Sequence, residues 1–365
     1  MSSELGMDER QSTLIKAMRF PLIVLVVWSH ALGFKREAIT FELSGWNVYH
    51  FVSEMVSHHI GKLAVCWFFV FSGYFFFRNL EEGAFSWSWV ASKWRTRIRS
   101  LLIPFVLWNL LVVVMTLAKS KLYAITGIGD DGGIQWLRET GPLYWFWSGP
   151  ADFPLWYMRD LILLTLLTPA IYFVFRNLKL RGGTAFMIIL AVLIAVFRIN
   201  FLCFSFRPLV FFCLGALLGI WKVNMLSVCR KVEKPAAILA VVSLLIATYF
   251  NASESHELML YVFYPFGMIT LMNLCDRLTR SPKRCDQLCG LSGAVFFIYG
   301  AHEIFILGWT KGLFLRVFGD GLLGAWMSFL FGPLVVIAVC YVLWRVFSRL
   351  TPKTLALFCG GRVKK

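Results

Sequence analysis

The sequence predicts an all-α fold, a polytopic bundle of about ten transmembrane helices with both termini in the cytoplasm. Of its 365 residues, 59% are hydrophobic, 17% are aromatic and only 15% are charged. These charged side chains are too few to cover the surface of a soluble domain. Lipid must therefore cover the surface instead. Long apolar runs recur along the whole chain, and short basic segments separate them.

A helix needs about 20 apolar residues to cross the bilayer core, and several runs approach that length. The expected spans lie near 18–34, 59–77, 100–118, 153–175, 183–198, 207–222, 236–250, 257–274, 289–308 and 324–347. No internal repeat or low-complexity tract interrupts them, so residues 1–365 are expected to form a single membrane domain. Residues 1–17 then form a cytoplasmic N-terminal segment, and residues 348–365 form a basic cytoplasmic tail.

The chain carries a net charge of +16, and most of its Lys and Arg residues lie in alternate segments between the expected spans. Nucleic-acid binding needs basic residues gathered on one face or tail, so that function class is excluded. A bias of Lys and Arg toward one side of the membrane instead sets orientation, and here it places both termini inside. The expected partner of the surface is a lipid bilayer.

The nine cysteines mostly lie in apolar runs or in expected cytoplasmic segments, so we expect no disulfide framework. Cys285 and Cys289 could ligate a metal ion, but no His or second Cys pair with zinc spacing follows them. The sequence therefore predicts reduced structural thiols and no metal.

Ionisable side chains at membrane depth are functional hypotheses, because lipid penalises their charge. Arg19 and His30 stand on one face of the first expected span, about three helical turns and roughly 16 Å apart. A cation at the cytoplasmic end suits a phosphorylated donor, and a deeper imidazole suits a general base. Equally open is the alternative that Arg19 only sets topology and His30 only packs.

His302 and Glu303 lie in FFIYGAHEIFI of the ninth expected span, where His302 should reach a depth similar to that of His30. Both histidines could then face one cavity. Glu303 points about 100° away from His302 on a helix, so it could orient a histidine of a neighbouring helix or bond within the bundle. A structural role for His302 is nearly as well supported as a catalytic one.

Two further groups of polar residues have both a functional and a structural interpretation. Arg95, Arg97 and Arg99 precede the third expected span, where guanidinium groups could bind phosphates or merely set topology and attract lipid headgroups. In PLWYMRDL, residues of the fourth expected span could bind an acceptor, or the opposite charges could pair structurally. These residues are Trp156, Arg159 and Asp160.

The order and spacing of these pieces resembles the acyltransferase 3 family of integral membrane proteins over nearly the whole chain. The matching stretches are RFPLIVLVVWSH, WFFVFSGYFFF, the arginine run followed by IPFVLWN, LWYMRDL, RPLVFFCLGALLG and FFIYGAHEIFI. The resemblance implies that His30 is the central catalytic residue. It also implies a set of donor-binding residues: Arg19, Ser72, Tyr74, Arg95, Arg97 and Arg99. Relatives often show Arg-x-x-Arg where this chain has Arg-x-Arg-x-Arg, so which arginine meets phosphate stays open.

The resemblance further implies an activity. Members transfer an acyl group from cytoplasmic acyl-CoA to an extracytoplasmic glycan or glycolipid, and acetyl-CoA is the default donor. The resemblance also implies that the protein lies in a bacterial inner membrane. His30 would act as general base or carry the acyl group covalently. The alternative is a proton-coupled secondary transporter or a flippase, because carriers also need titratable groups at mid-depth.

Overall fold

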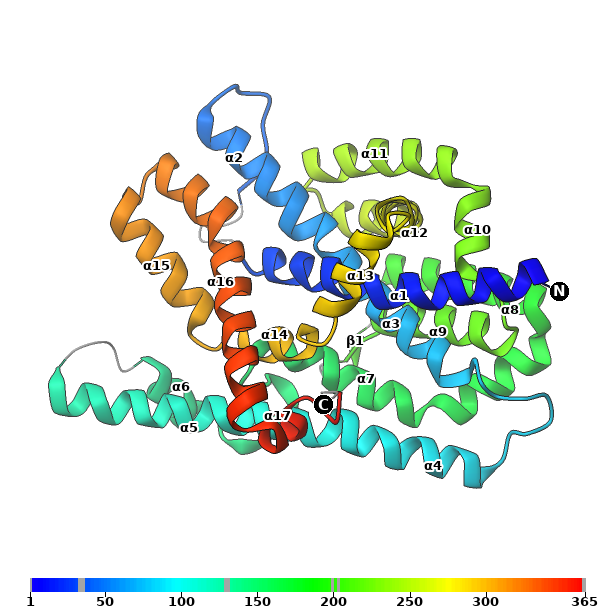
Figure 1. The fold of residues 1–365 in the computed structure, drawn as a ribbon. Helices are drawn as coiled ribbons and strands as arrows, with labels where there is room; N and C mark the ends of the chain where they lie inside the picture. Colours follow the sequence, from blue (N-terminus) through cyan, green and yellow to red (C-terminus); the bar gives the residue numbers. More distant parts are fainter. Residues whose placement is uncertain (1, 32–36, 128–131, 198–199, 202–203, 363–365) are drawn as a thin grey trace.

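The computed structural model describes residues 2–31, 37–127, 132–197, 200–201 and 204–362, and it is a bundle of helices that cross at varied angles (Figure 1). Helix α1 (Ser2–Ser29) runs through the middle and contacts α3 (Lys62–Phe77) and α14 (Val295–Ala301). Two short strands, β1 (Asn200–Phe201) and β2 (Phe204–Ser205), pair antiparallel. The all-α prediction is confirmed in all but this small pairing.

The other elements follow in chain order. The α-helices are α2 (Gly45–Ser53), α4 (Trp87–Arg97), α5 (Ile103–Thr126), α6 (Gly132–Thr140), α7 (Trp156–Leu166), α8 (Thr168–Phe197), α9 (Arg207–Ile220), α10 (Met225–Lys231), α11 (Glu233–Tyr249), α12 (His256–Leu278), α13 (Pro282–Leu291), α15 (Ile306–Phe318), α16 (Leu322–Leu350) and α17 (Pro352–Phe358). The π-helices are η1 (Glu54–Ile60), η2 (Ile98–Leu102) and η3 (Tyr144–Ser148), and η4 (Phe153–Leu155) is a 3₁₀ helix.

Within the described residues, six helical segments are long and apolar enough to cross a membrane. They are Asp8–Ser29, Gly45–Phe77, Trp87–Thr126, Thr168–Phe197, His256–Leu278 and Leu322–Leu350. Helices α9 and α10 add a seventh if the pair, bent by 106°, counts as one span. The expected count of ten and the cytoplasmic termini stay predictions. The expected ranges 18–34, 183–198 and 348–365 each end in residues outside the described part of the chain.

Helix α8 is divided at Lys179, where the backbone has φ 54°. This break lies between the expected spans 153–175 and 183–198, so the second of these begins in the later half of α8. The first is itself interrupted, because α7 ends at Leu166 and α8 begins at Thr168.

The expected span 289–308 is not one continuous helix. Helix α14 ends at Ala301, and α15 begins at Ile306 after Phe305, whose φ of 60° is left-handed. Bulky residues rarely adopt this conformation, so surrounding packing must impose it. His302 and Glu303, which we call the His-Glu pair, therefore lie in a break between two helices. The prediction that placed His302 within a continuous helix is wrong.

Glycines allow α3 and α9 to pack with their backbones in contact. A Cβ added to Gly215 would lie 2.0 Å from the carbonyl oxygen of Val70, and one on Gly73 would lie 2.1 Å from that of Phe212. Small residues at helix interfaces are typical of membrane proteins, because close packing there replaces the hydrophobic drive of water. This contact fixes α3, which lines the cavity described below.

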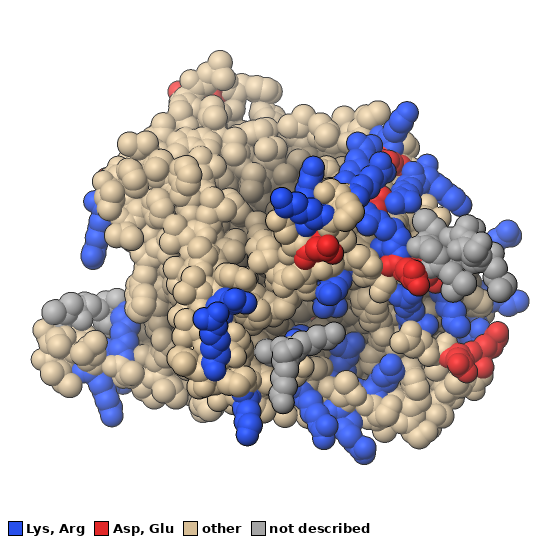
Figure 2. Space-filling model, in the orientation of Figure 1, with Lys and Arg blue, Asp and Glu red and all other residues tan. Residues whose placement is uncertain are grey.

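Basic side chains gather mainly over one half of the molecule, around the start of α1 and along α4, whereas uncharged atoms dominate the other half (Figure 2). A buried carboxylate organises part of the basic half. Asp276 of α12 accepts hydrogen bonds from Arg10 of α1 at 2.8 Å and from Arg230 of α10 at 2.6 Å. These ion pairs tie three helices together at one end of the bundle.

Candidate active site

A cavity of about 910 Å³ extends along α1, between that helix and α3, α7, α13 and α14. Its lining includes Arg19 and, about three turns further along the chain, His30, which directly follows α1. Around the Arg19 end lie further cations, namely Lys16, Arg97 and Arg362. No Asp or Glu occurs among the described residues that line it. The cavity therefore joins a strongly cationic region to an imidazole.

Arg362 reaches the cavity because the chain turns back after α17. Gly360 and Gly361 have φ of 60° and 75°, and a Cβ on Gly360 would lie 2.7 Å from the carbonyl oxygen of Ser100. The guanidinium lies 4.2 Å from the centre of the Phe296 ring and donates to the carbonyl oxygen of Cys359 at 3.1 Å. Loss of surrounding water, together with the charge of Arg97, lowers the pKa of Arg362 to about 10, so it is a cation at neutral pH.

Of the expected arginine run, only Arg97 lines the cavity. Arg95 and Arg97 both lie in α4, where residues two apart point about 160° away from each other, and Arg99 lies in the π-helix η2. The Arg97 guanidinium lies 5.9 Å from the centre of the Phe76 ring. The structure thus separates one arginine of the run from the other two.

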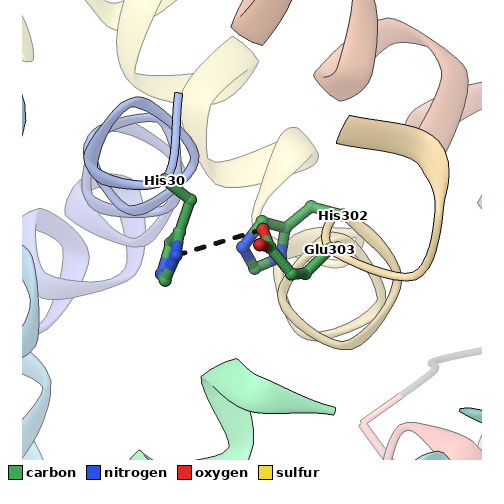
Figure 3. A group of neighbouring side chains, drawn as sticks. All are labelled: His30, His302 and Glu303. Carbon is green, nitrogen blue, oxygen red and sulfur yellow. Dashed lines mark ion pairs between the residues drawn. The ribbon is translucent and has the colours of Figure 1, made fainter. Parts of the chain in front are cut away.

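His30 follows the last residue of α1 and lies close to both members of the His-Glu pair (Figure 3). Its Nδ1 is 4.0 Å from Glu303 Oε2, too far for a hydrogen bond but close enough for a charge interaction. The ring centres of His30 and His302 are 5.3 Å apart. Lys311 Nζ donates to the His30 carbonyl oxygen at 2.6 Å, which satisfies an end of α1 that otherwise lacks a helical partner.

The break after α14 fixes the tautomer of His302. Its Nδ1 lies 2.8 Å from the carbonyl oxygen of Tyr299 and 3.1 Å from that of Ile298. Both are acceptors, so Nδ1 carries a proton. His302 is completely buried, and within the described residues its Nε2 has no hydrogen-bond partner. In the neutral form of His302 this nitrogen would present a lone pair near His30.

This arrangement suits proton transfer. A carboxylate on the Nδ1 side of an imidazole orients the ring and stabilises the imidazolium that forms when Nε2 takes a proton. His30, His302 and Glu303 were all candidates from the sequence, and the structure brings them together although the last two lie in a helix break. Their catalytic role stays a prediction.

Comparison with known proteins decides the family. Residues 14–345 match the family model Acyl_transf_3, described as an acyltransferase domain. The chain belongs to the acyltransferase 3 family. It is also 23% identical over 373 residues to the succinoglycan biosynthesis protein ExoH of Rhizobium meliloti (strain 1021), an alignment that covers 98% of this chain and 94% of that protein. No solved structure matches this chain.

The family match confirms the resemblance inferred from the sequence, and with the long apolar helices it makes this acyltransferase 3 protein a multi-pass membrane protein. The matched range contains Arg19, Arg97 and His30 but ends before Arg362. The cation that closes the cavity from the C-terminal side is therefore outside the family model. A Gly-Gly-Arg sequence after an apolar helix was the signal that could have found it.

Three other candidates have different surroundings in this acyltransferase. Ser72 and Trp156 line the cavity, and Ser72 Oγ lies 3.4 Å from the hydroxyl of Tyr157. Tyr74 is buried away from the lining, and its hydroxyl accepts a hydrogen bond from Gln11 at 2.8 Å. The hydrogen bond from Gln11 links α1 and α3, and a role for Tyr74 in donor binding stays a prediction.

Arg159 and Asp160 form a buried pair outside the cavity lining. Arg159 Nε donates to Asp160 Oδ1 at 2.8 Å, and Arg159 Nη1 donates to the carbonyl oxygen of Trp147 at 2.7 Å. The structure thus matches the alternative of structural pairing that the sequence left open, and it does not bring this pair to the cavity. Its role in acceptor binding stays a prediction.

Proposed function

We propose that this protein transfers a short acyl group, acetyl in the first instance, from cytoplasmic acyl-CoA to a hydroxyl of an extracytoplasmic glycan or glycolipid in a bacterial inner membrane. The proposal rests on one observation: the same cavity is lined by a cluster of cations and by His30. The name of the relative, a succinoglycan biosynthesis protein, supports a glycan as acceptor.

The cationic region fits the phosphates of CoA. Guanidinium groups bind phosphate oxygens in pairs, and Arg19, Arg97 and Arg362 all line one region of the cavity. Because no described carboxylate lines it, these charges are available to a ligand rather than neutralised by the protein. The rise of α1 separates Arg19 from His30 by roughly 16 Å, which leaves room for the extended arm of CoA between phosphate and thioester.

The reaction proceeds by proton transfer at His30. The acceptor hydroxyl gives its proton to Nε2 of His30, and its oxygen forms a bond to the thioester carbonyl carbon. The carbon–sulfur bond then breaks, and the thiolate of CoA receives the proton from the imidazolium. Glu303, 4.0 Å from Nδ1, stabilises the positive charge that the ring carries between the two steps.

Sealed inside-out membrane vesicles test this proposal with radiolabelled acetyl-CoA. The unaltered chain should label an acceptor, and His30→Ala should lower the rate about 10²–10⁴-fold. His50→Ala is the matched control, because His50 lies in α2, near Glu37 and outside the cavity lining. Uptake of a substrate without acetyl-CoA, with no acylation at all, would instead identify a transporter.

A further inference from the structure

A second cluster of ionisable residues lies outside the cavity lining. Glu54 and His59 of η1 and His256 at the start of α12 are all buried. His59 Nε2 lies 3.4 Å from Glu54 Oε1 and 3.4 Å from His256 Nε2. The three potential ligand atoms all lie within 4.8 Å of one another.

A hydroxyl group fixes the tautomer of His59. Thr248 Oγ1 donates its only proton to the carbonyl oxygen of Leu244 at 2.7 Å. It lies 2.9 Å from His59 Nδ1 and must accept there, so Nδ1 carries a proton. The Nε2 of His59 then lies on the side of a carboxylate oxygen and a second imidazole nitrogen. Two imidazoles and one carboxylate therefore converge on one point, as the ligands of a metal ion do.

The π-helical backbone makes this convergence possible. In an α-helix, residues five apart point about 140° away from each other. In a π-helix each N–H bonds to the residue five positions before it, as Gly61 does to Val56 at 2.8 Å, so Glu54 and His59 share a face. Such segments occur frequently at functional sites. Because the spacing is unlike the helical i, i+4 pattern, the site could not be recognised from the sequence.

We propose that Glu54, His59 and His256 bind one divalent transition-metal ion, with Zn²⁺ the best match. Nitrogen and oxygen ligands at about 2.0–2.1 Å in a tetrahedron lie about 3.4 Å from each other, which matches the two separations that His59 Nε2 makes with Glu54 and His256. Two imidazoles and one carboxylate are a common zinc set, and water completes the fourth position. Thr248 holds the far nitrogen of His59, as groups around metal ligands typically do.

This site goes beyond the proposed acyl transfer and departs from the expectation of no metal. The ion would tie η1 to α12, and the contact of His59 with Thr248 joins η1 to α11. Ser57 and His58 of η1 line the cavity, and His58 Nε2 lies 4.0 Å from Glu54 Oε2. The metal would therefore hold one wall of the cavity without touching the reacting atoms.

Metal analysis of the purified full-length protein in detergent tests the site. The protein is stripped with a chelator, reloaded with Zn²⁺ and separated from unbound ion before elemental analysis. The unaltered chain should hold about one zinc ion, and Glu54→Gln and His256→Ala should each hold at least about tenfold less. The matched controls Glu37→Gln and His50→Ala change another Glu-His pair, whose atoms are 3.5 Å apart, and should keep the ion.

A second readout avoids dependence on variants that fold poorly. Co²⁺ bound to the unaltered chain should give the visible absorption of a four-coordinate ion, which Zn²⁺ displaces, and Zn²⁺ should raise the melting temperature. The proposal is overturned if the unaltered chain holds less than about a tenth of an equivalent after reloading. It is also overturned if well-folded Glu54→Gln and His256→Ala variants retain the ion equally, which would show an adventitious ion only.

Discussion

Gly215→Ala tests the close packing that positions one wall of the cavity. The new Cβ would lie 2.0 Å from the Val70 carbonyl oxygen, and ordinary contact begins near 3.4 Å, so the helices must separate by about 1.4 Å. A sideways shift offers little relief, because Gly73 is equally close to the opposite backbone. Overpacking of this kind costs about 1–3 kcal/mol, which for a chain of 365 residues corresponds to a fall of roughly 1–4 °C in melting temperature.

Thermal unfolding of the purified protein in detergent, followed by tryptophan fluorescence, measures this fall. Gly312→Ala in α15 is the matched control, because its Cβ would meet nothing within 4 Å. Alanine in a helix is about 0.5–1 kcal/mol better than glycine, so this variant should melt at the same or a higher temperature. A Gly215→Ala protein as stable as Gly312→Ala would refute the packing argument. Acyl transfer should fall with stability, because α3 carries Ser72 into the cavity.

Three further outcomes are expected. Arg362→Gln should raise the KM for acyl-CoA about 10–100-fold, because a charged contact with a phosphate is lost. The control Lys353→Gln, outside the cavity lining, should leave this KM unchanged. Equal KM values for the two variants would show that Arg362 is not part of the donor site. Initial rates of Glu303→Gln should show a kcat about tenfold lower or more, with little change in the KM for acyl-CoA. An unchanged kcat would show that the charge of Glu303 does not assist His30. Asp276→Asn should destabilise the protein by about 1–3 kcal/mol, because it removes the charge that pairs with Arg10 and Arg230; an unchanged melting temperature would contradict that role.

Much of the fold could be predicted from the sequence because lipid imposes strict patterns. Apolar length and basic flanks indicate where helices lie whatever they pack against. Helical rise and periodicity alone place Arg19 and His30 on one helix face, and the structure adds that both line the same cavity.

The remaining features depend on contacts that no local pattern records. Residues 302–305, between α14 and α15, include neither Gly nor Pro to mark a break, yet tertiary packing gives Phe305 a left-handed backbone. That break places His302 and Glu303 beside His30. Glu54 and His59 share a face only in a π-helix, and nothing in EMVSHHI distinguishes that helix from an ordinary one.

The described charged residues that line the cavity are all basic, which has a consequence for turnover under the proposed function. With acyl-CoA as the donor, small anions balance Arg19, Arg97 and Arg362 whenever no donor is bound, so donor binding is an anion exchange. After the proposed transfer, free CoA would keep every phosphate that binds these residues and would have lost only its acyl group. We therefore expect spent CoA to compete strongly with fresh donor, and the rate of the protein to follow the ratio of acylated to free CoA in the cell.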